Sequence, residues 1–115
     1  MKIIIPGKPI PKARARIGKH GAYTPQRTAQ YERLVAGMAL IARQEAHEKL
    51  WTGPVNLEVR IYPDRVEVMA AQMEGEARTV GGDISNVLKA VEDGLQGVIF
   101  KNDRQVEYLT VRLVK

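Results

Sequence analysis

The stretch DISNVLKAVEDGL, residues 83–95, has the pattern of an amphipathic helix that opens with a carboxylate. Its apolar residues recur at intervals of three and four, which places them on one stripe of a helix with about 3.6 residues per turn. They are Ile84, Val87, Leu88, Val91 and Leu95. Asp83 stands where an N-cap residue is favoured, and Gly97 lies just beyond the last apolar position, where glycine commonly ends a helix. The sequence therefore predicts a helix that begins directly after Asp83.

A second acidic position, Asp103, follows this predicted helix. The pair Asn102-Asp103 separates two β-rich runs, and both residue types favour turns, so we expect Asp103 on a turn or at a strand edge. Two carboxylates brought together by a helix start and a nearby loop would form a minimal magnesium site, because Mg²⁺ prefers hard oxygen ligands. From these residues alone, the simpler explanation is that Asp83 caps a helix and Asp103 forms a turn.

Residues 83–95, followed by Lys101-Asn102-Asp103-Arg104-Gln105-Val106, resemble the RusA family of Holliday junction resolvases. That family carries an Asp-x-Asp-Asn-x-x-Lys helix start, an Asp-Ala-Leu-like helix end and an Asp-Asp-x-Gln-Val turn. Weaker similarity reaches a Pro-rich opening, a basic segment and a helix with an early Tyr. The resemblance implies a magnesium-dependent endonuclease that acts as a homodimer on four-way DNA junctions.

The resemblance also implies roles for single residues. Asp83 and Asp103 match metal-binding Asp residues, which makes them candidate catalytic residues and Mg²⁺ ligands. Lys89 matches the active-site Lys, and we expect it to stabilise negative charge that develops on the scissile phosphate. Asn86 matches the Asn of the motif and is a candidate DNA contact.

Two positions depart from the family's pattern. Ser85 stands where a second Asp is usual, and Asn102 replaces the first Asp of the turn pair. Glu92 lies on the same helical flank as Ser85 and Lys89, because these residues are four and seven positions apart. Seven residues span about 10 Å of helix, so Glu92 is a weak candidate metal ligand. Ser85 is a weak candidate as well, because it offers only a hydroxyl or a bridging water. An ion pair between Glu92 and Lys89, or plain solvation, is the alternative.

Length and composition are those of one small globular domain. The chain has 115 residues, 44% of them hydrophobic and none of them Cys. A core is therefore expected, while disulfides and thiolate zinc sites are excluded. No apolar run approaches the length of about 18 residues that a membrane span needs. We expect a cytoplasmic protein without a membrane partner.

Positive charge is concentrated at the start of the chain. The net charge is +5, and seven basic residues but no acidic residue precede Glu32. They are Lys2, Lys8, Lys12, Arg14, Arg16, Lys19 and Arg27. Such a block suits a phosphate-binding arm, although a solvated basic loop has the same composition.

Within this block, alternation would place three basic side chains on one face of an extended segment. The candidate DNA contacts of the arm are Lys12, Arg14, Arg16 and Lys19. The sequence Gly18-Lys19-His20-Gly21 predicts a tight turn after them. His20 between turn glycines is expected to be exposed and without a catalytic role.

The remaining pattern predicts an α+β fold in one domain, residues 1–115. It comprises a strand at 2–5, a basic loop at about 6–24, a helix at about 25–49 and a strand at 55–61. An irregular connection at about 65–82 follows, in which 66–68 could extend a strand and 69–76 could form a short helix. After the helix that begins at Asp83, residues 104–114 read as a final strand. The order β-α-β-α-β suggests a two-layer sandwich of two main helices on a small mixed sheet.

The resemblance thus implies a structure-selective DNA endonuclease that resolves four-way junctions by paired symmetric nicks, in recombination and repair. The first alternative is a catalytically weak or inactive branched-DNA-binding protein of the same fold, because Ser85 and Asn102 remove carboxylates. The second is a small basic module that binds RNA or protein and matches the motifs by chance.

Overall fold

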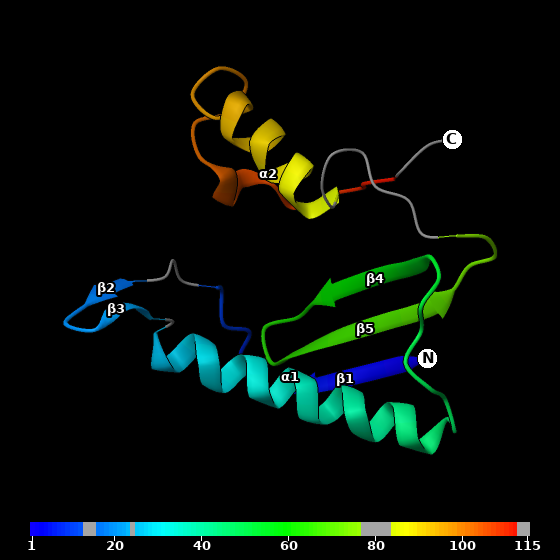
Figure 1. Ribbon diagram of the computed structural model, residues 1–115. Coiled ribbons are helices and arrows are strands. Elements are labelled where there is room, and N and C mark those ends of the chain that lie inside the picture. The colour runs from blue at the N-terminus through cyan, green and yellow to red at the C-terminus, as the bar shows by residue number, and fades with distance from the viewer. Residues whose placement is uncertain (13–15, 24, 77–83, 113–115) are drawn as a thin grey trace. The chain divides into compact units, whose positions relative to one another are not determined.

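The computed structural model describes residues 1–12, 16–23, 25–76 and 84–112 (Figure 1). The chain divides into two compact units, Met1–Ala77 and Arg78–Lys115. The element order is β1, β2, β3, α1, β4, β5, α2 and the short 3₁₀ helix η1. The predicted α+β class with two main helices, α1 (Gln26–Glu45) and α2 (Ile84–Leu95), is confirmed. In the part of the chain that the structure describes, no helix is long and apolar enough to cross a membrane.

The unit Met1–Ala77 is built on a three-stranded sheet of β1 (Lys2–Pro6), β4 (Val55–Ile61) and β5 (Arg65–Gln72). The strand order is β1-β5-β4, and β5 pairs antiparallel with both neighbours. The prediction of a mixed sheet was therefore wrong for the described strands. Residues 62–64 join β4 to β5, and so short a connection can only join antiparallel neighbours.

The prediction of an irregular connection was also wrong over its first half. Residues 65–72 form β5, the central strand, so 69–72 are not helical. Of the two options left open for this region, the strand at 66–68 is confirmed. Pairing explains the outcome, because β5 has a partner on each side and its backbone hydrogen bonds are satisfied along its length.

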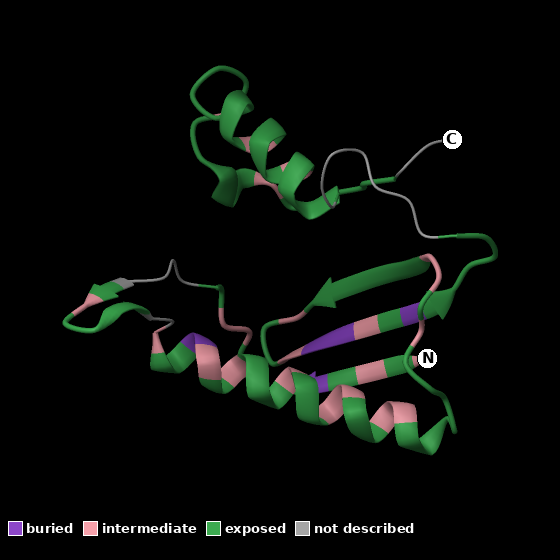
Figure 2. Cartoon of the chain, viewed as in Figure 1, coloured by how far each residue is buried: buried purple, intermediate pink, exposed green. Residues whose placement is uncertain are grey.

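The core lies on one face of this sheet. Ile5 and Val66 are directly opposite each other in the β1–β5 register, and both are buried, as is Ala70 (Figure 2). Helix α1 packs along β1 and covers this face. The two-layer arrangement is thus present in this unit. The residues of β4 are exposed, including its apolar Leu57 and Val59.

Helix α1 is shorter than the predicted range of 25–49 because a Schellman motif ends it. The Glu48 N–H donates to the Arg43 carbonyl at 3.0 Å, and the His47 N–H donates to the Gln44 carbonyl at 3.1 Å. This closure places His47 in the left-handed region, with φ of 54°. His47 is the one non-glycine residue with positive φ among the described residues.

The final strand predicted at 104–114 is not observed over the residues that the structure describes there. Asp103–Gln105 form η1, and residues 106–112 have no regular secondary structure. Alternation at Leu109 and Val111 suits a strand, but a strand also needs a paired neighbour, and none of the described strands pairs with this segment. The full β-α-β-α-β order is therefore not present in the described residues.

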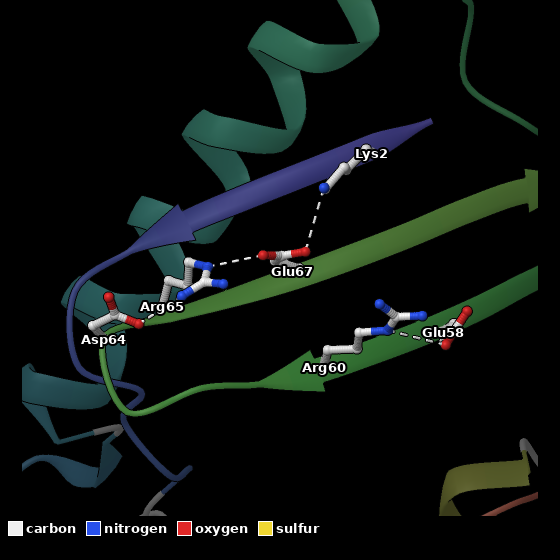
Figure 3. A network of polar contacts seen from close by, with 6 residues as sticks. All are labelled: Lys2, Glu58, Arg60, Asp64, Arg65 and Glu67. Atoms are coloured by element: carbon white, nitrogen blue, oxygen red, sulfur yellow. Dashed lines mark hydrogen bonds and ion pairs between the residues drawn. The ribbon is translucent and has the colours of Figure 1, made fainter.

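On the face opposite the core, a polar network centres on Glu67 (Figure 3). Arg65 donates to Glu67 at 2.8 Å and to Asp64 at 2.9 Å, and its guanidinium lies 3.8 Å from the centre of the Tyr62 ring. Lys2 on β1 adds an ion pair to Glu67 at 3.4 Å. The hydrogen bond from Arg65, with a further contribution from Lys2, holds the pKa of the Glu67 carboxyl below its ordinary value although burial opposes this.

We predict that Glu67 makes the fold acid-sensitive. Because its pKa is lower in the folded state, its stabilising contribution is complete above the unfolded pKa of about 4.3 and is lost as pH falls through the folded pKa. Glu67→Gln should lower the urea midpoint at pH 7 and flatten its dependence on pH between about 5 and 2. Glu58→Gln is the matched control, because Glu58 pairs with Arg60 at the surface. An unchanged acid dependence in Glu67→Gln would contradict the assignment.

A second prediction concerns the end of α1. A left-handed conformation costs a non-glycine residue about 1–2 kcal/mol, so His47→Gly should raise the free energy of unfolding by about 0.5–1 kcal/mol. Ala46→Gly is the control, because Ala46 has the helical φ of −82° and should lose a similar amount. Urea titration of both variants measures the difference. Destabilisation by His47→Gly would show that its side chain, not the backbone, decides this helix end.

Candidate functional site

The first part of the candidate site is the start of α2, in the unit Arg78–Lys115. Asp83 lies outside the described residues, and the helix begins at the residue after it, as predicted. Ser85 and Asn86 occupy the first turn and Lys89 the second, and all three are exposed. They are therefore open to a large, charged ligand.

The flank predicted for Ser85, Lys89 and Glu92 follows from the observed helix. All three residues are helical, and at about 100° per residue they fall within one narrow sector. Glu92 is half-buried, whereas Ser85 and Lys89 are exposed. Glu92 therefore differs in environment from the two residues with which it shares the flank.

Helix α2 ends where the sequence predicts. Gly97 adopts a φ of 84°, which glycine tolerates without strain, and its N–H donates to the Phe100 carbonyl at 2.6 Å. The Val98 and Ile99 N–H groups both donate to the Leu95 carbonyl. This closed turn leads the chain from α2 toward Asp103.

The second part of the site is the turn that carries Asp103. Asn102 caps η1 (Asp103–Gln105), since its Oδ1 accepts a hydrogen bond from the Arg104 N–H at 2.9 Å. In return, Oε1 of Gln105 accepts from the N–H groups of Asn102 and Lys101, at 2.9 and 2.8 Å. This capping box fixes the turn and leaves Asp103 exposed in the first turn of η1.

The capping box gives Asn102 a structural role. Asn is among the best capping residues, and it supplies the same acceptor oxygen as Asp without the charge. The turn is therefore held by an uncharged side chain at position 102. Because residue 102 is Asn, the carboxylate of Asp103 has no acidic neighbour at that position.

Only part of the predicted metal site lies within the described residues. Lys89, Ser85 and Asp103 belong to one compact unit, but Asp83 is not described, so the Asp83–Asp103 pair stays a prediction. No group of three or more His, Asp or Glu side chains that could hold a metal occurs among the described residues. The donors nevertheless fit Mg²⁺ chemically, because this ion binds through one or two carboxylates and keeps several waters.

The basic segment forms a hairpin of β2 (Arg16–Gly18) and β3 (Gly21–Tyr23), and the predicted turn at Lys19 and His20 is confirmed. Lys19 is exposed at this turn. Arg14 lies outside the described residues, so the predicted common face of Lys12, Arg14 and Arg16 remains a prediction. Lys12 forms an ion pair with Glu32 of α1 at 2.9 Å.

The sequence reading missed the polar network around Glu67. Asp64 belongs to this network, since it pairs with Arg65. The signal for this network was the alternation of Arg65, Val66 and Glu67, which places Arg65 and Glu67 on one face of a strand. Their mutual pairing and their distance in sequence from the Asp83 helix indicate a structural role.

Two open cavities lie beside α1 and are lined partly by its residues. One, of about 530 Å³, is bounded by Ile3, Leu40, Trp51 and other mainly apolar residues, none of them acidic. The other, of about 400 Å³, has Glu32 as its acidic residue, and Glu32 is paired with Lys12. Neither cavity offers the cluster of oxygen ligands that a magnesium-dependent reaction needs.

Comparison with known proteins places this arrangement in context. The family model described as Endodeoxyribonuclease RusA matches residues 6–115. The chain is also 30% identical, over 123 aligned residues, to the uncharacterized protein YqaN of Bacillus subtilis (strain 168). That alignment covers 96% of this chain and 84% of YqaN. No solved structure matches the chain.

Proposed function

We propose that this chain, which belongs to the RusA endodeoxyribonuclease family, is a magnesium-dependent endonuclease that resolves four-way DNA junctions by paired symmetric nicks. The observation that carries the proposal is the span of the family match. It includes the basic hairpin, the start of α2 and the Asp103 turn in one match over residues 6–115. The proposed role is in DNA recombination and repair, as a cytoplasmic enzyme.

The carboxylates of Asp83 and Asp103 would hold the metal. Bound Mg²⁺ supplies a Lewis acid for the scissile phosphate and lowers the pKa of its bound water. Asp103 is supported in this role by the capping box, which holds its backbone in a fixed turn at the surface. Ser85 offers a hydroxyl oxygen, and Glu92 a more distant carboxylate, as weaker donors to the same ion.

Lys89 would act on the phosphate. It lies one helical turn after Ser85 on an exposed flank, where its ammonium group can approach a DNA backbone. Fixed positive charge near the phosphate stabilises the negative charge that develops as the new bond forms. Asn86, exposed on the first turn of α2, is proposed to contact the DNA beside it.

The basic arm would supply most of the affinity for DNA through phosphate contacts by Lys12, Arg14, Arg16 and Lys19. Lys12 would exchange Glu32 for a phosphate, which costs little because both side chains are largely exposed and surface ion pairs are weak. Binding of this kind falls steeply with salt as counterions are released.

A homodimer is proposed because resolution requires two symmetric cuts. A two-fold axis presents the same site to both strands of the junction.

A second candidate function is binding of branched DNA without cutting. The observation that favours it is the neutral Asn102, which preserves the turn while reducing the negative charge near Asp103. Ser85 reduces the charge at the helix start in the same way. Cleavage distinguishes the two functions, because both predict a preference for junctions over linear duplex.

We predict that Asp83→Asn and Asp103→Asn each reduce cleavage by about 100-fold or more, as expected when a metal ligand is lost. Junction affinity should be kept or increased, because each change removes a negative charge near phosphates. The measurement is cleavage of a labelled four-way junction beside a matched linear duplex, with Mg²⁺ or with chelator. Asp93→Asn, an exposed change on α2, is the control and should cut normally.

The outcomes separate the proposals. Symmetric, Mg²⁺-dependent nicks that both variants lose would support the resolvase. Tight junction binding without any cut by the wild-type chain would favour the binding protein. Normal cleavage by Asp83→Asn or Asp103→Asn would refute the metal assignment.

A further prediction concerns Ser85. If Ser85 only lacks a ligand, Ser85→Asp should restore a carboxylate and raise the cleavage rate at limiting Mg²⁺ by about tenfold, the effect of about 1.4 kcal/mol. Ser85→Ala is the matched variant, and it should change the rate little. A fall in activity with Ser85→Asp would instead show that the site has adapted to a hydroxyl at this position.

A further inference from the structure

We propose that the β2–β3 hairpin enters the branch point of the DNA and that Ile17 is the apolar wedge that separates its base pairs. This inference rests on the proposed function, since it names the part of the chain that recognises a branch. It concerns a residue of the hairpin that carries no charge and has no part in the metal site.

Ile17 is a large apolar residue at an exposed strand position. It lies in the middle of β2 and has 89% of its surface exposed, whereas Ile5 in β1 has 1% exposed. Its partner across the hairpin is Ala22, also exposed, so the two side chains form one bare apolar face on the ribbon. A β-branched residue favours the strand, but strand formation alone does not require a large apolar side chain at a solvent-exposed site.

The hairpin has little support from the rest of its unit. Among the described residues, β2 and β3 contact each other, and neither makes a comparable contact with α1 or with the three-stranded sheet. A two-stranded ribbon is marginally stable in water by itself, so a partner that covers it would also stabilise it.

Charge identifies that partner as a polyanion. Lys19 lies in the turn next to Ile17, Arg16 precedes Ile17 on β2, and no acidic residue occurs before Glu32. Glu32 itself is paired with Lys12. An apolar residue that Arg16 and Lys19 flank in the sequence matches a ligand that presents phosphates beside bases, and DNA at a branch point has both.

The physics of intercalating side chains explains why a branch would be preferred. Apolar wedges such as Ile and Leu insert between base steps, and the main cost is the stacking that they break. In a continuous duplex the base step is held by stacking and by an unbroken helix on both sides, whereas at a branch point the strands exchange partners and the flanking base pairs are easier to unstack. A wedge at this site therefore converts a difference in stacking into a preference for junctions, without reading the base sequence.

The test uses a four-way junction with 2-aminopurine at the branch point, whose fluorescence rises when the base unstacks. The full-length chain carries Asp103→Asn so that the DNA stays intact. Ile17→Val and Ile17→Thr are then compared in this background, because both retain a β-branched residue and only Val remains apolar. Ile61→Thr is the surface control, since Ile61 is also largely exposed but lies on β4.

We expect binding of the Asp103→Asn chain to raise the fluorescence several-fold. Ile17→Val and Ile61→Thr should keep this rise, and Ile17→Thr should lose most of it while the salt dependence of binding stays unchanged. Circular dichroism verifies that the variants are folded. Preference for the junction over linear duplex should fall in parallel with the fluorescence in Ile17→Thr.

Two results would overturn the wedge alone. Retention of the full fluorescence rise by Ile17→Thr would remove Ile17 from the branch point, even if the chain cuts junctions. The absence of any rise in a chain that binds and cuts junctions would do the same, while leaving the proposed function intact. No preference for junctions in the wild-type chain would instead refute the proposed function, and the wedge with it.

Discussion

The central strand β5 is the constraint on which the unit Met1–Ala77 depends. It is hydrogen-bonded to β1 on one side and β4 on the other, so it aligns segments that are far apart in the sequence. One face of β5 supplies Val66 and Ala70 to the core beneath α1. The opposite face supplies Glu67 to the polar network with Arg65 and Lys2. A single strand thus carries both the apolar packing and the charge pairing that hold β1 in register.

The parts of the fold that the sequence predicted well are those determined by local pattern. The stripe of α2 repeats over several turns, and Gly97 provides a stop, so both ends of the helix were predictable. Alternation at 55–61 likewise predicted β4. The segment 65–72 was harder, because Met69 and the two Ala residues that follow suit a helix as well as a strand. Its pairing with β1 and β4, which no local pattern contains, decides in favour of the strand.

The candidate site shows the same division between local and non-local information. The helix start, the turn at Asp103 and the hairpin around Lys19 follow from nearby residues and are present. The ion pairs of Lys12 with Glu32 and of Asp64 with Arg65 join side chains whose pairing the motif reading did not include. The prediction of a final strand was wrong for a related reason. Alternation at Leu109 and Val111 indicates a preference for extended backbone, but it does not supply a neighbouring strand among the described residues.

The capping box at Asn102 has a consequence for how such a site can evolve. The turn is held by a side-chain acceptor at position 102 and by the amide of Gln105, and it needs no bound ion for its shape. Asp, Asn and Ser can all serve as the acceptor. A lineage can therefore change the charge beside Asp103 by single substitutions without rebuilding the loop. The backbone geometry of the turn and the electrostatic potential that an approaching cation meets are separate traits, open to independent selection.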